Sequence, residues 1–166
     1  GIISDTHNQK ENLQSALDWL REMGVKTLIH CGDLTDPELI QYLRGFKVYY
    51  VFGNGDAYSG EIEYQLKCLD KDNRADLALD LELADERFFV THGHQEALLN
   101  QALKFCSYAY VICGHTHCYC DEKHGDTRVI NPGALGGLER DARSFGILDT
   151  QSKGFERILM DTIKNV

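Results

Sequence analysis

Apolar and polar residues follow two different patterns along the first third of the chain, short apolar runs and a helical periodicity. Short apolar runs such as "VKTLIHCG" (25–32) and "FKVYYVFG" (46–53) predict buried strands, and "GIIS" at the start has the same character. Apolar residues recur at three- and four-residue spacing over residues 9–23, which predicts an amphipathic helix. Asp36, followed by a proline, predicts the start of a short second helix. This β-α-β-α-β order indicates a parallel sheet with right-handed crossovers.

The pattern changes after residue 56. Residues 57–76 are polar and predict a loop with some helix. Two extended runs in "LALDLELADERFFVTHG" then meet at an Ala84-Asp85-Glu86 turn, which predicts a hairpin, and a helix is expected around 95–105. Further strands are expected at 108–114, 119–122, 127–131, 144–149 and 155–160. A parallel half followed by hairpins predicts an α/β fold in which two mixed sheets pack face to face with helices outside, in one domain spanning residues 1–166.

Composition and charge narrow the classes of function. The chain has 166 residues, of which 43% are hydrophobic and 26% charged, as in ordinary globular proteins. No apolar run approaches the roughly 20 residues that a membrane helix needs, so no membrane partner is expected. The net charge of −9 argues against binding of long nucleic acid, which needs a basic surface. A phosphate substrate stays compatible, because bound cations can reverse the charge locally.

The cysteines and the start of the chain bear on location. Six cysteines without a CxxC pair are typical of reduced thiols, and they favour a cytoplasmic protein. No positively charged start followed by an apolar segment is present, so a secretory signal is not expected. The chain opens at "GIISD", already at the end of a predicted strand, and we expect a few residues to precede it. Association into a homo-oligomer is left open.

Five successive predicted strands are each followed by Asp, Asn or His, residues that can bind a metal or take part in catalysis. Open α/β sheets bind their ligands at the carboxyl ends of strands. Separately each residue is an ordinary turn or capping residue, but jointly they place five of the seven histidines just past strand ends, which turns alone do not explain. We expect His30 in the core and His124 in an exposed turn. The strand-end residues are Asp5, His7, Asp33, Asn54, Asp56, His92, His94, His115 and His117.

The residue types indicate a metal centre. A mixture of Asp and Asn oxygens with His nitrogens suits Mn, Fe, Zn or Ni better than the all-oxygen sites of Ca or the thiolate sites of structural Zn. So many ligands are too many for one tetrahedral ion. They suit two divalent transition-metal ions that share a bridging carboxylate.

The segments "SDTHN", "HCGDL", "FGNGD", "VTHGH" and "CGHTH", in this order, resemble the calcineurin-like metallophosphoesterase superfamily. The short chain and "INPGA" at 130–134 are similar to its small bacterial and archaeal phosphodiesterase branch, which is also similar to the retromer scaffold subunit of eukaryotes. The resemblance implies a four-layer α/β/β/α sandwich. It also implies two metal ions bridged by Asp33, one held by Asp5, His7 and His117, and the other by Asn54, His92 and His115.

The implied activity is hydrolysis of a small phosphodiester or nucleotide-like substrate by water activated between two ions, with Mn²⁺ preferred. Many family members carry a histidine after the asparagine ligand, where this chain has Gly55. We therefore expect His94, two residues beyond His92, to assist the leaving group or to pack as an outer neighbour of the ligands, and Asp56 to orient a ligand or simply to form the turn. The alternative is a scaffold that keeps the fold without useful catalysis, and phosphomonoesterase or pyrophosphatase activity is left open.

Four further residues in or near these motifs receive minor roles. We expect Asn8 to cap the first helix rather than to contact substrate. Cys118 and Cys120 are expected to be small buried or half-buried residues without a metal or redox role. The resemblance places "INPGA" near the substrate phosphate, with Asn131 as a candidate backbone-positioning or donor residue.

Overall fold

The alternation of apolar strands and amphipathic helices at the start of the chain produces the parallel part of a first β-sheet. The computed structural model describes residues 1–105 and 107–163. In this part of the chain the first sheet has the order β11-β10-β1-β2-β3-β4, and β1 to β4 run parallel. Its strands are β1 (Ile2–Ile3), β2 (Thr27–His30), β3 (Lys47–Val51), β4 (Arg74–Asp76), β10 (Ser144–Asp149) and β11 (Gly154–Leu159).

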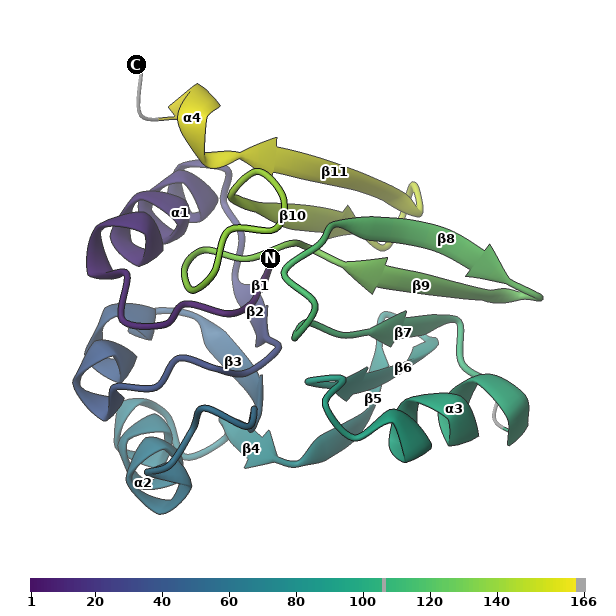
Figure 1. The fold of residues 1–166 in the computed structure, drawn as a ribbon, viewed down its shortest axis with the longest axis horizontal. Coiled ribbons are helices and arrows are strands. Elements are labelled where there is room, and N and C mark those ends of the chain that lie inside the picture. Colours follow the sequence, from purple (N-terminus) through teal and green to yellow (C-terminus); the bar gives the residue numbers. More distant parts are fainter. Residues whose placement is uncertain (106, 164–166) are drawn as a thin grey trace.

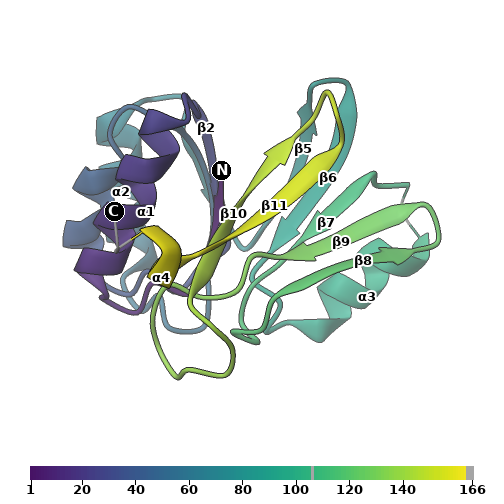
Figure 2. The same cartoon turned by 90° about the horizontal axis from the view of Figure 1, so that it is seen from above.

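A second mixed sheet is built from the hairpins of the second half. Its order is β5-β6-β7-β9-β8, in which β6, β7 and β9 are parallel and the two edge strands are antiparallel. The two sheets face each other (Figure 2). The strands are β5 (Ala78–Leu83), β6 (Glu86–Thr91), β7 (Tyr110–Ile112), β8 (Cys120–His124) and β9 (Thr127–Asn131).

Helices cover the outer faces of both sheets (Figures 1 and 2). Leu13, Ala16, Leu17 and Leu20 of α1 are buried, at the spacing that predicted this helix. Asp36 caps the short helix as expected, accepting a hydrogen bond from the Glu38 N–H at 2.9 Å. None of the described helices is long and apolar enough to cross a bilayer. The helices are α1 (Lys10–Glu22), the 3-10 helix η1 (Pro37–Leu43), α2 (Ser59–Leu69), α3 (Glu96–Phe105) and α4 (Met160–Ile163).

Three apolar clusters separate the four layers. The first joins α1, η1 and α2 to the first sheet, and includes Leu17 and Phe145. The second lies between the two sheets and includes Ile29 and Phe88. The third joins α3 to the outer face of the second sheet through Ala102 and Val111. The α/β fold with two mixed sheets packed face to face and helices outside, the expected α/β/β/α sandwich, is confirmed.

The segment 57–76 is more ordered than its polar sequence predicted. It forms the whole of α2, which buries only Ile62 and Leu66, and the short strand β4, which pairs with β3. Two buried residues in eleven give a weak apolar rhythm, and a three-residue edge strand gives none. These elements are stabilised by contacts with β3 and η1 rather than by their own sequence pattern.

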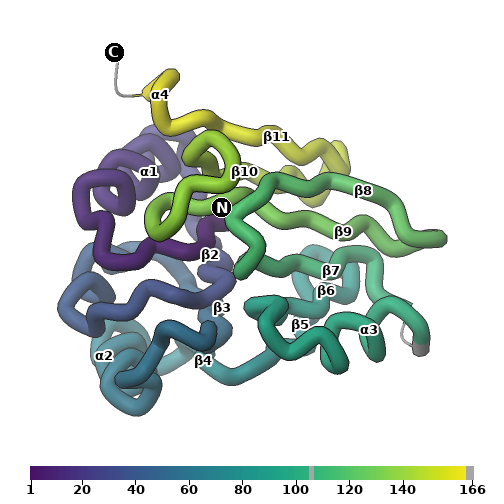
Figure 3. Tube along the Cα trace, in the orientation of Figure 1, coloured from purple at the N-terminus to yellow at the C-terminus, as the bar shows by residue number. Residues whose placement is uncertain are grey.

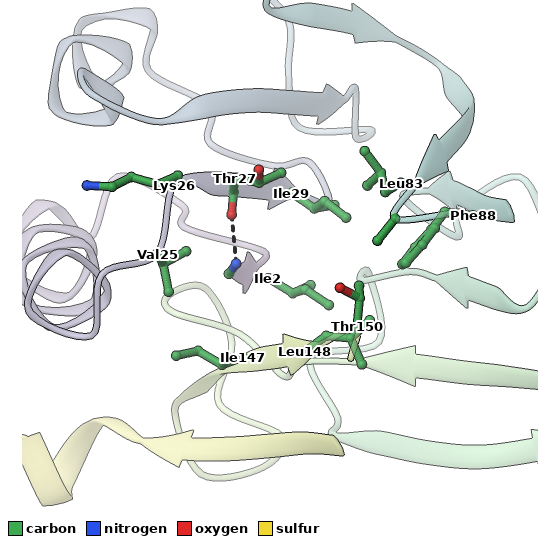
Figure 4. Close-up of a pocket in the computed structure, with 12 residues that line it drawn as sticks. Ile2, Val25, Lys26, Thr27, Ile29, Leu83, Phe88, Ile147, Leu148 and Thr150 are labelled. Carbon is green, nitrogen blue, oxygen red and sulfur yellow. Dashed lines mark hydrogen bonds between the residues drawn. The ribbon is translucent and has the colours of Figure 1, made fainter. Parts of the chain in front are cut away.

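An apolar pocket of about 370 Å³ lies between the sheets, lined in part by Ile2, Ile29, Leu83, Phe88 and Leu148 (Figure 4). Its other walls include the residues at the amino end of β2. The strand-end Asp and His residues follow the carboxyl ends of the same strands. The pocket is therefore separate from the candidate chemistry.

His30 lies in the core beneath the strand ends, as predicted, and is fully buried. Its Nδ1 accepts a hydrogen bond from the Gly32 N–H at 3.1 Å, so the ring proton is on Nε2, 3.0 Å from the Thr6 hydroxyl. The ring stacks on Tyr50 with centroids 4.8 Å apart. Burial lowers the pKa of His30 to about 4, so the ring is neutral in the folded protein. The predicted turn residue His124 ends β8 and is exposed.

The buried, neutral His30 should make the stability depend on pH. In the unfolded chain His30 becomes protonated below about pH 6.5, whereas in the folded chain it stays neutral down to about pH 4. This residue therefore lowers the free energy of unfolding as the pH falls through that window, by up to about 1.4 kcal/mol per pH unit. Urea unfolding of the wild type and His30→Gln at neutral and mildly acidic pH measures it, with a smaller acid loss expected in the variant. The same acid loss in both proteins would contradict the assignment.

Candidate metal centre

The predicted site residues follow the carboxyl ends of strands in both sheets. Asp5 and His7 follow β1, and Asp33 follows β2 in the first sheet. His92 follows β6, and His115 and His117 follow β7 in the second sheet. Within each sheet these strands are parallel, so their carboxyl ends meet at one edge. The face-to-face packing brings the two edges together.

The structure gathers most of the predicted ligands into two overlapping groups. Ligand atoms of Asp5, His7 and His117 lie within 4.8 Å of one another, and so do those of Asp5, Asp33 and His92. The Nε2 atoms of His7 and His117 are 3.2 Å apart. Asp5 Oδ1 lies 3.2 Å from His117 Nε2 and 3.7 Å from His7 Nε2. One carboxylate, Asp5, thus faces ligands from both sheets.

Asp33 lies between two histidines. Its Oδ2 is 3.6 Å from His7 Nε2 and 3.5 Å from His92 Nε2. Its Oδ1 accepts a hydrogen bond from the Gly55 N–H at 2.6 Å. One oxygen is therefore held by the backbone, while the other is directed toward imidazoles on either side.

The remaining candidates border these groups. The His115 ring lies 5.1 Å from that of His92, and its backbone N–H donates to Asp5 Oδ2 at 3.0 Å. The His94 ring is 5.3 Å from His92 and 6.2 Å from His115. Asn54 is exposed, in the turn whose Gly55 N–H binds Asp33.

Among the predicted metal ligands, two buried atoms have no hydrogen-bond partner within the described residues, Asp5 Oδ1 and His92 Nε2. The other ring nitrogen of His92, Nδ1, donates to the Cys31 carbonyl at 2.6 Å, because a carbonyl only accepts. In a neutral ring, His92 Nε2 then carries a lone pair that faces the Asp33 carboxylate. Leaving such atoms buried and unpaired is costly. A divalent cation would satisfy both, so the residues present fit a metal.

The charges of the site agree with this. Burial would raise the pKa of Asp33, but electrostatic attraction from His92 and His7, together with the hydrogen bond from the Gly55 N–H, lowers it to about 2. Burial likewise opposes ionisation of Asp5, but His7, His92 and Ser4 hold its pKa below the ordinary value. In return, the nearby carboxylates of Asp5 and Asp33 raise the pKa of His7. The site is an anionic centre that attracts protons or metal cations.

Backbone strain is concentrated at the same strand ends. Ten non-glycine residues of the described chain have positive φ, and the three outside the site lie in hairpin turns. Such left-handed residues cost roughly 1–3 kcal/mol each and persist where the surroundings enforce them. The strained residues at the site are Asp5, His7, Asn8, Asp33, Thr35, His115 and His117.

Asp56 organises the loops that carry the ligands. Its Oδ2 accepts hydrogen bonds from the Asp33 N–H at 3.0 Å, the Gly53 N–H at 2.8 Å and the Tyr50 hydroxyl at 2.7 Å. Its Oδ1 accepts from the Thr35 N–H at 3.0 Å. The side chain thereby fixes the backbone before and after Asp33, and whether it serves the reaction beyond this stays a prediction.

Gly55, directly after the predicted ligand Asn54, has little room for a side chain. A Cβ atom there would lie 3.0 Å from Asp33 Oδ1 and 3.1 Å from the methyl group of Thr35. Any larger residue would press on the Asp33 carboxylate. The glycine is therefore matched to the close approach of its own N–H to Asp33.

Two of the minor sequence predictions are wrong. Asn8 does not cap α1, whose N-cap is Gln9 without a side-chain hydrogen bond. Instead Asn8 Oδ1 accepts from the Thr35 hydroxyl at 2.6 Å, because a left-handed backbone turns the residue toward the next loop. Cys118 is exposed rather than buried, whereas Cys120 is half-buried as expected.

Other groups support the site through the backbone, and of these the sequence had indicated only Asn131. Asn131 Nδ2 donates to the Gly114 carbonyl at 2.8 Å and the Thr116 hydroxyl at 3.0 Å, so it holds the histidine turn. The backbone carbonyls of Cys31 and Leu138 each accept from a histidine, at 2.6 Å and 2.7 Å. Every residue has a carbonyl, so no residue type marks such a role before the fold is known.

A family profile, a sequence relative and solved structures all point to the same protein family. The profile of the calcineurin-like phosphoesterase superfamily domain matches residues 1–153. A phosphodiesterase of Methanocaldococcus jannaschii is 34% identical over 163 residues, which cover 97% of this chain and 98% of the relative. The solved structure of an archaeal phosphodiesterase has a TM-score of 0.91 at 35% identity, covering 96% and 98%. Vps29 from Entamoeba histolytica shares the fold, with a TM-score of 0.68 at 22% identity, covering 95% and 97%.

The geometry predicts that the cysteines after the histidine turn are dispensable for metal binding. Cys113 is buried, and burial raises the pKa of its thiol to about 12, so it stays protonated and unreactive. Cys118 is exposed, and the described metal-ligand groups contain no cysteine. We expect Cys118→Ser and Cys120→Ser to bind as much metal as the wild type, measured by elemental analysis after loading and desalting. A loss of metal in either variant would show that thiols belong to the site.

Proposed function

The chain belongs to the calcineurin-like phosphoesterase superfamily, and on that premise we propose that it is a phosphodiesterase whose reaction depends on two divalent metal ions. The proposal rests chiefly on one observation: Asp5 Oδ1 and His92 Nε2 are buried without hydrogen bonds at a point where strand ends of both sheets meet. The 34% identical relative, which is named a phosphodiesterase, supports the type of ester.

Asp33 is the proposed bridge. Its Oδ2 lies nearly equally far from His7 and His92, which supports a position between two ions. The mixed oxygen and nitrogen donors favour Mn²⁺, with Fe, Zn or Ni as alternatives. The proposed ligands are Asp5, His7 and His117 for one ion and Asn54, His92 and His115 for the other.

When bound, the two ions would supply an activated water and neutralise charge on the phosphoryl oxygens. The chain's own residues prepare the site for this. Cys31 and Leu138 orient His92 and His117 through their carbonyls, so that both Nε2 lone pairs are available. Asp56 fixes the loop that presents Asp33.

His94 is the proposed group that assists the leaving oxygen. Burial, together with repulsion from His92 and His115, lowers its pKa, so the ring is neutral near pH 7 and retains one N–H donor. Its buried Nδ1 has no hydrogen-bond partner among the described residues. An unpaired ring nitrogen beside the proposed ligands supports a role toward substrate.

The proposed substrate is a small phosphodiester or nucleotide-like molecule. The net charge of −9 disfavours long nucleic acid, whereas a small ester needs only the local charge of the ions. We propose a cytoplasmic location, which five free cysteines in the described residues support.

The competing function is a scaffold, favoured by Gly55 and by the shared fold with Vps29. Interaction surfaces of a scaffold need neither the strained backbone at five of the proposed ligands nor the unpaired buried atoms. The phosphodiesterase proposal accounts for both features, and we prefer it.

The first test is Mn²⁺-dependent hydrolysis of bis(p-nitrophenyl) phosphate beside the corresponding monoester. We expect faster turnover of the diester and a loss of activity with a chelator. Asp33→Asn should lower the rate at least about 100-fold, because it removes charge worth several kcal/mol at the proposed bridge. The matched control is Asp18→Asn, at an exposed carboxylate of α1, which should behave like the wild type.

Three results would count against the proposal. Metal bound without turnover of either ester would favour the scaffold. Preference for the monoester would point to a phosphomonoesterase. Full activity in Asp33→Asn would reject the site assignment itself.

A second test addresses His94. If its ring assists the leaving oxygen, His94→Gln should slow diesters with poor leaving groups much more than activated aryl diesters, because good leaving groups need little help. Rates measured over a series of aryl leaving groups of increasing pKa should show a steeper dependence in the variant. An equal loss across the series would make His94 a packing residue.

A further inference from the structure

His117 is oriented by a loop far from its own turn. Its Nδ1 lies 2.7 Å from the Leu138 carbonyl, which can only accept, so Nδ1 carries the proton. In the neutral ring the Nε2 lone pair then faces Asp5 Oδ1 and His7 Nε2, each 3.2 Å away. The direction of this ligand therefore depends on where the Leu138 carbonyl is held.

Leu138 belongs to the connection between β9 and β10, residues 132–143, which we name the covering loop. The loop contains no helix or strand and lies beside the end of β1 (Figure 3), where the Leu135 N–H donates to the Ser4 carbonyl at 3.1 Å. Its base is closed by the Ser144 N–H, which donates to the Ala134 carbonyl at 3.2 Å. Inside it, the Gly136 N–H donates to the Asp5 carbonyl at 2.7 Å. The first part of the loop is thus tied to the ligand segment after β1.

The next residues pack directly on the ligands. Gly137 has φ +66°, and a Cβ atom there would collide with the rings of His7 and His117. Backbone therefore lies against both imidazoles at a place where only glycine fits. Leu138 follows immediately and is 67% exposed as a residue, so burial of its side chain does little to hold its carbonyl in place.

Arg143 holds this part of the loop. Its guanidinium donates through Nη1 to the Gly136 carbonyl and through Nη2 to the Gly137 carbonyl. The planar fork of arginine suits two acceptors at once, which a lysine cannot reproduce. The side chain is only 21% exposed, and its nearest acid, Glu139 at 3.9 Å, is 71% exposed and contributes little. The contacts that matter are the two carbonyls just before Leu138.

We infer that Arg143 is a positioning residue for one of the two metal ions, the ion held by Asp5, His7 and His117. It acts by fixing the covering loop, whose Leu138 carbonyl sets the direction of His117. The other ion is served by a separate support, because His92 is oriented by the Cys31 carbonyl at the end of β2. The inference rests on the proposed dinuclear centre. It predicts that the binding affinity of one ion depends on the covering loop and that the affinity of the other does not.

The test is calorimetric titration of the full chain, freed of metal by chelator, with MnCl₂. The wild type should bind two ions. Arg143→Ala should weaken one of them about 10- to 100-fold, the usual effect of removing an outer partner of a ligand, and leave the other unchanged. Arg143→Lys should be intermediate. Arg140→Ala is the matched control, because Arg140 is an exposed arginine of the same loop and should titrate like the wild type.

A double-mutant cycle tests the route through His117. In a His117→Ala chain, the ion held by Asp5 and His7 is already bound more weakly. The further change Arg143→Ala should not weaken that same ion again, because the ligand that Arg143 positions is gone. Additive losses would overturn the inference, and so would unchanged affinities in Arg143→Ala or an equal loss at both ions. Thermal unfolding of the metal-free proteins identifies a variant that fails to fold. In that case Arg143→Lys decides, and wild-type affinities in it would overturn the inference.

The outcome separates this inference from the proposed function. Fewer than two ions on the wild-type chain would contradict the dinuclear centre. The inference is then decided on the ion that remains sensitive to His117→Ala, and an unchanged affinity of that ion in Arg143→Ala would overturn it.

Discussion

Two buried carboxylates that must stay ionised form the constraint on which the rest of the structure depends. Asp5 and Asp33 are both almost completely buried, and their pKa values are held low by imidazoles and N–H groups around them. Like charges at close range in a poorly solvated place repel each other unless cations lie between them. Histidines arriving from the opposite sheet provide donors for such cations. The packing of the two sheets is therefore also an arrangement of charge.

The strained strand ends follow from this constraint. Directing Asp5, His7 and Asp33 toward one point requires the backbone to turn sharply right after short strands, and left-handed conformations do so. Hydrogen bonds from the neighbouring loops then hold those turns, with Asp56 accepting four of them. Local strain is thus offset by a network rather than by glycines alone, which is typical of functional sites.

The sequence was sufficient to predict the architecture and the candidate ligands that meet at the strand ends. It was not sufficient to predict the backbone and side-chain contacts that hold those ligands in place. Apolar periodicity predicted α1 and the first strands, and the repeated occurrence of Asp and His at strand ends indicated Asp5, Asp33 and His92. The polar strand β4 and the real partner of Asn8 were missed, because both depend on contacts distant in sequence. The roles of Leu138 and Arg143 were equally hidden, since they act on backbone carbonyls that every residue possesses.

The division of the ligands between the sheets has a mechanical consequence. Asp5 and Asp33 follow strands of the first sheet, and the histidines after β6 and β7 follow strands of the second. Bound ions would therefore cross-link two layers that are otherwise joined mainly by apolar contacts. Sliding of one sheet over the other would then break coordination before it exposed the interior. A higher free ion concentration would then raise the melting temperature, because only the folded chain offers the complete set of donors.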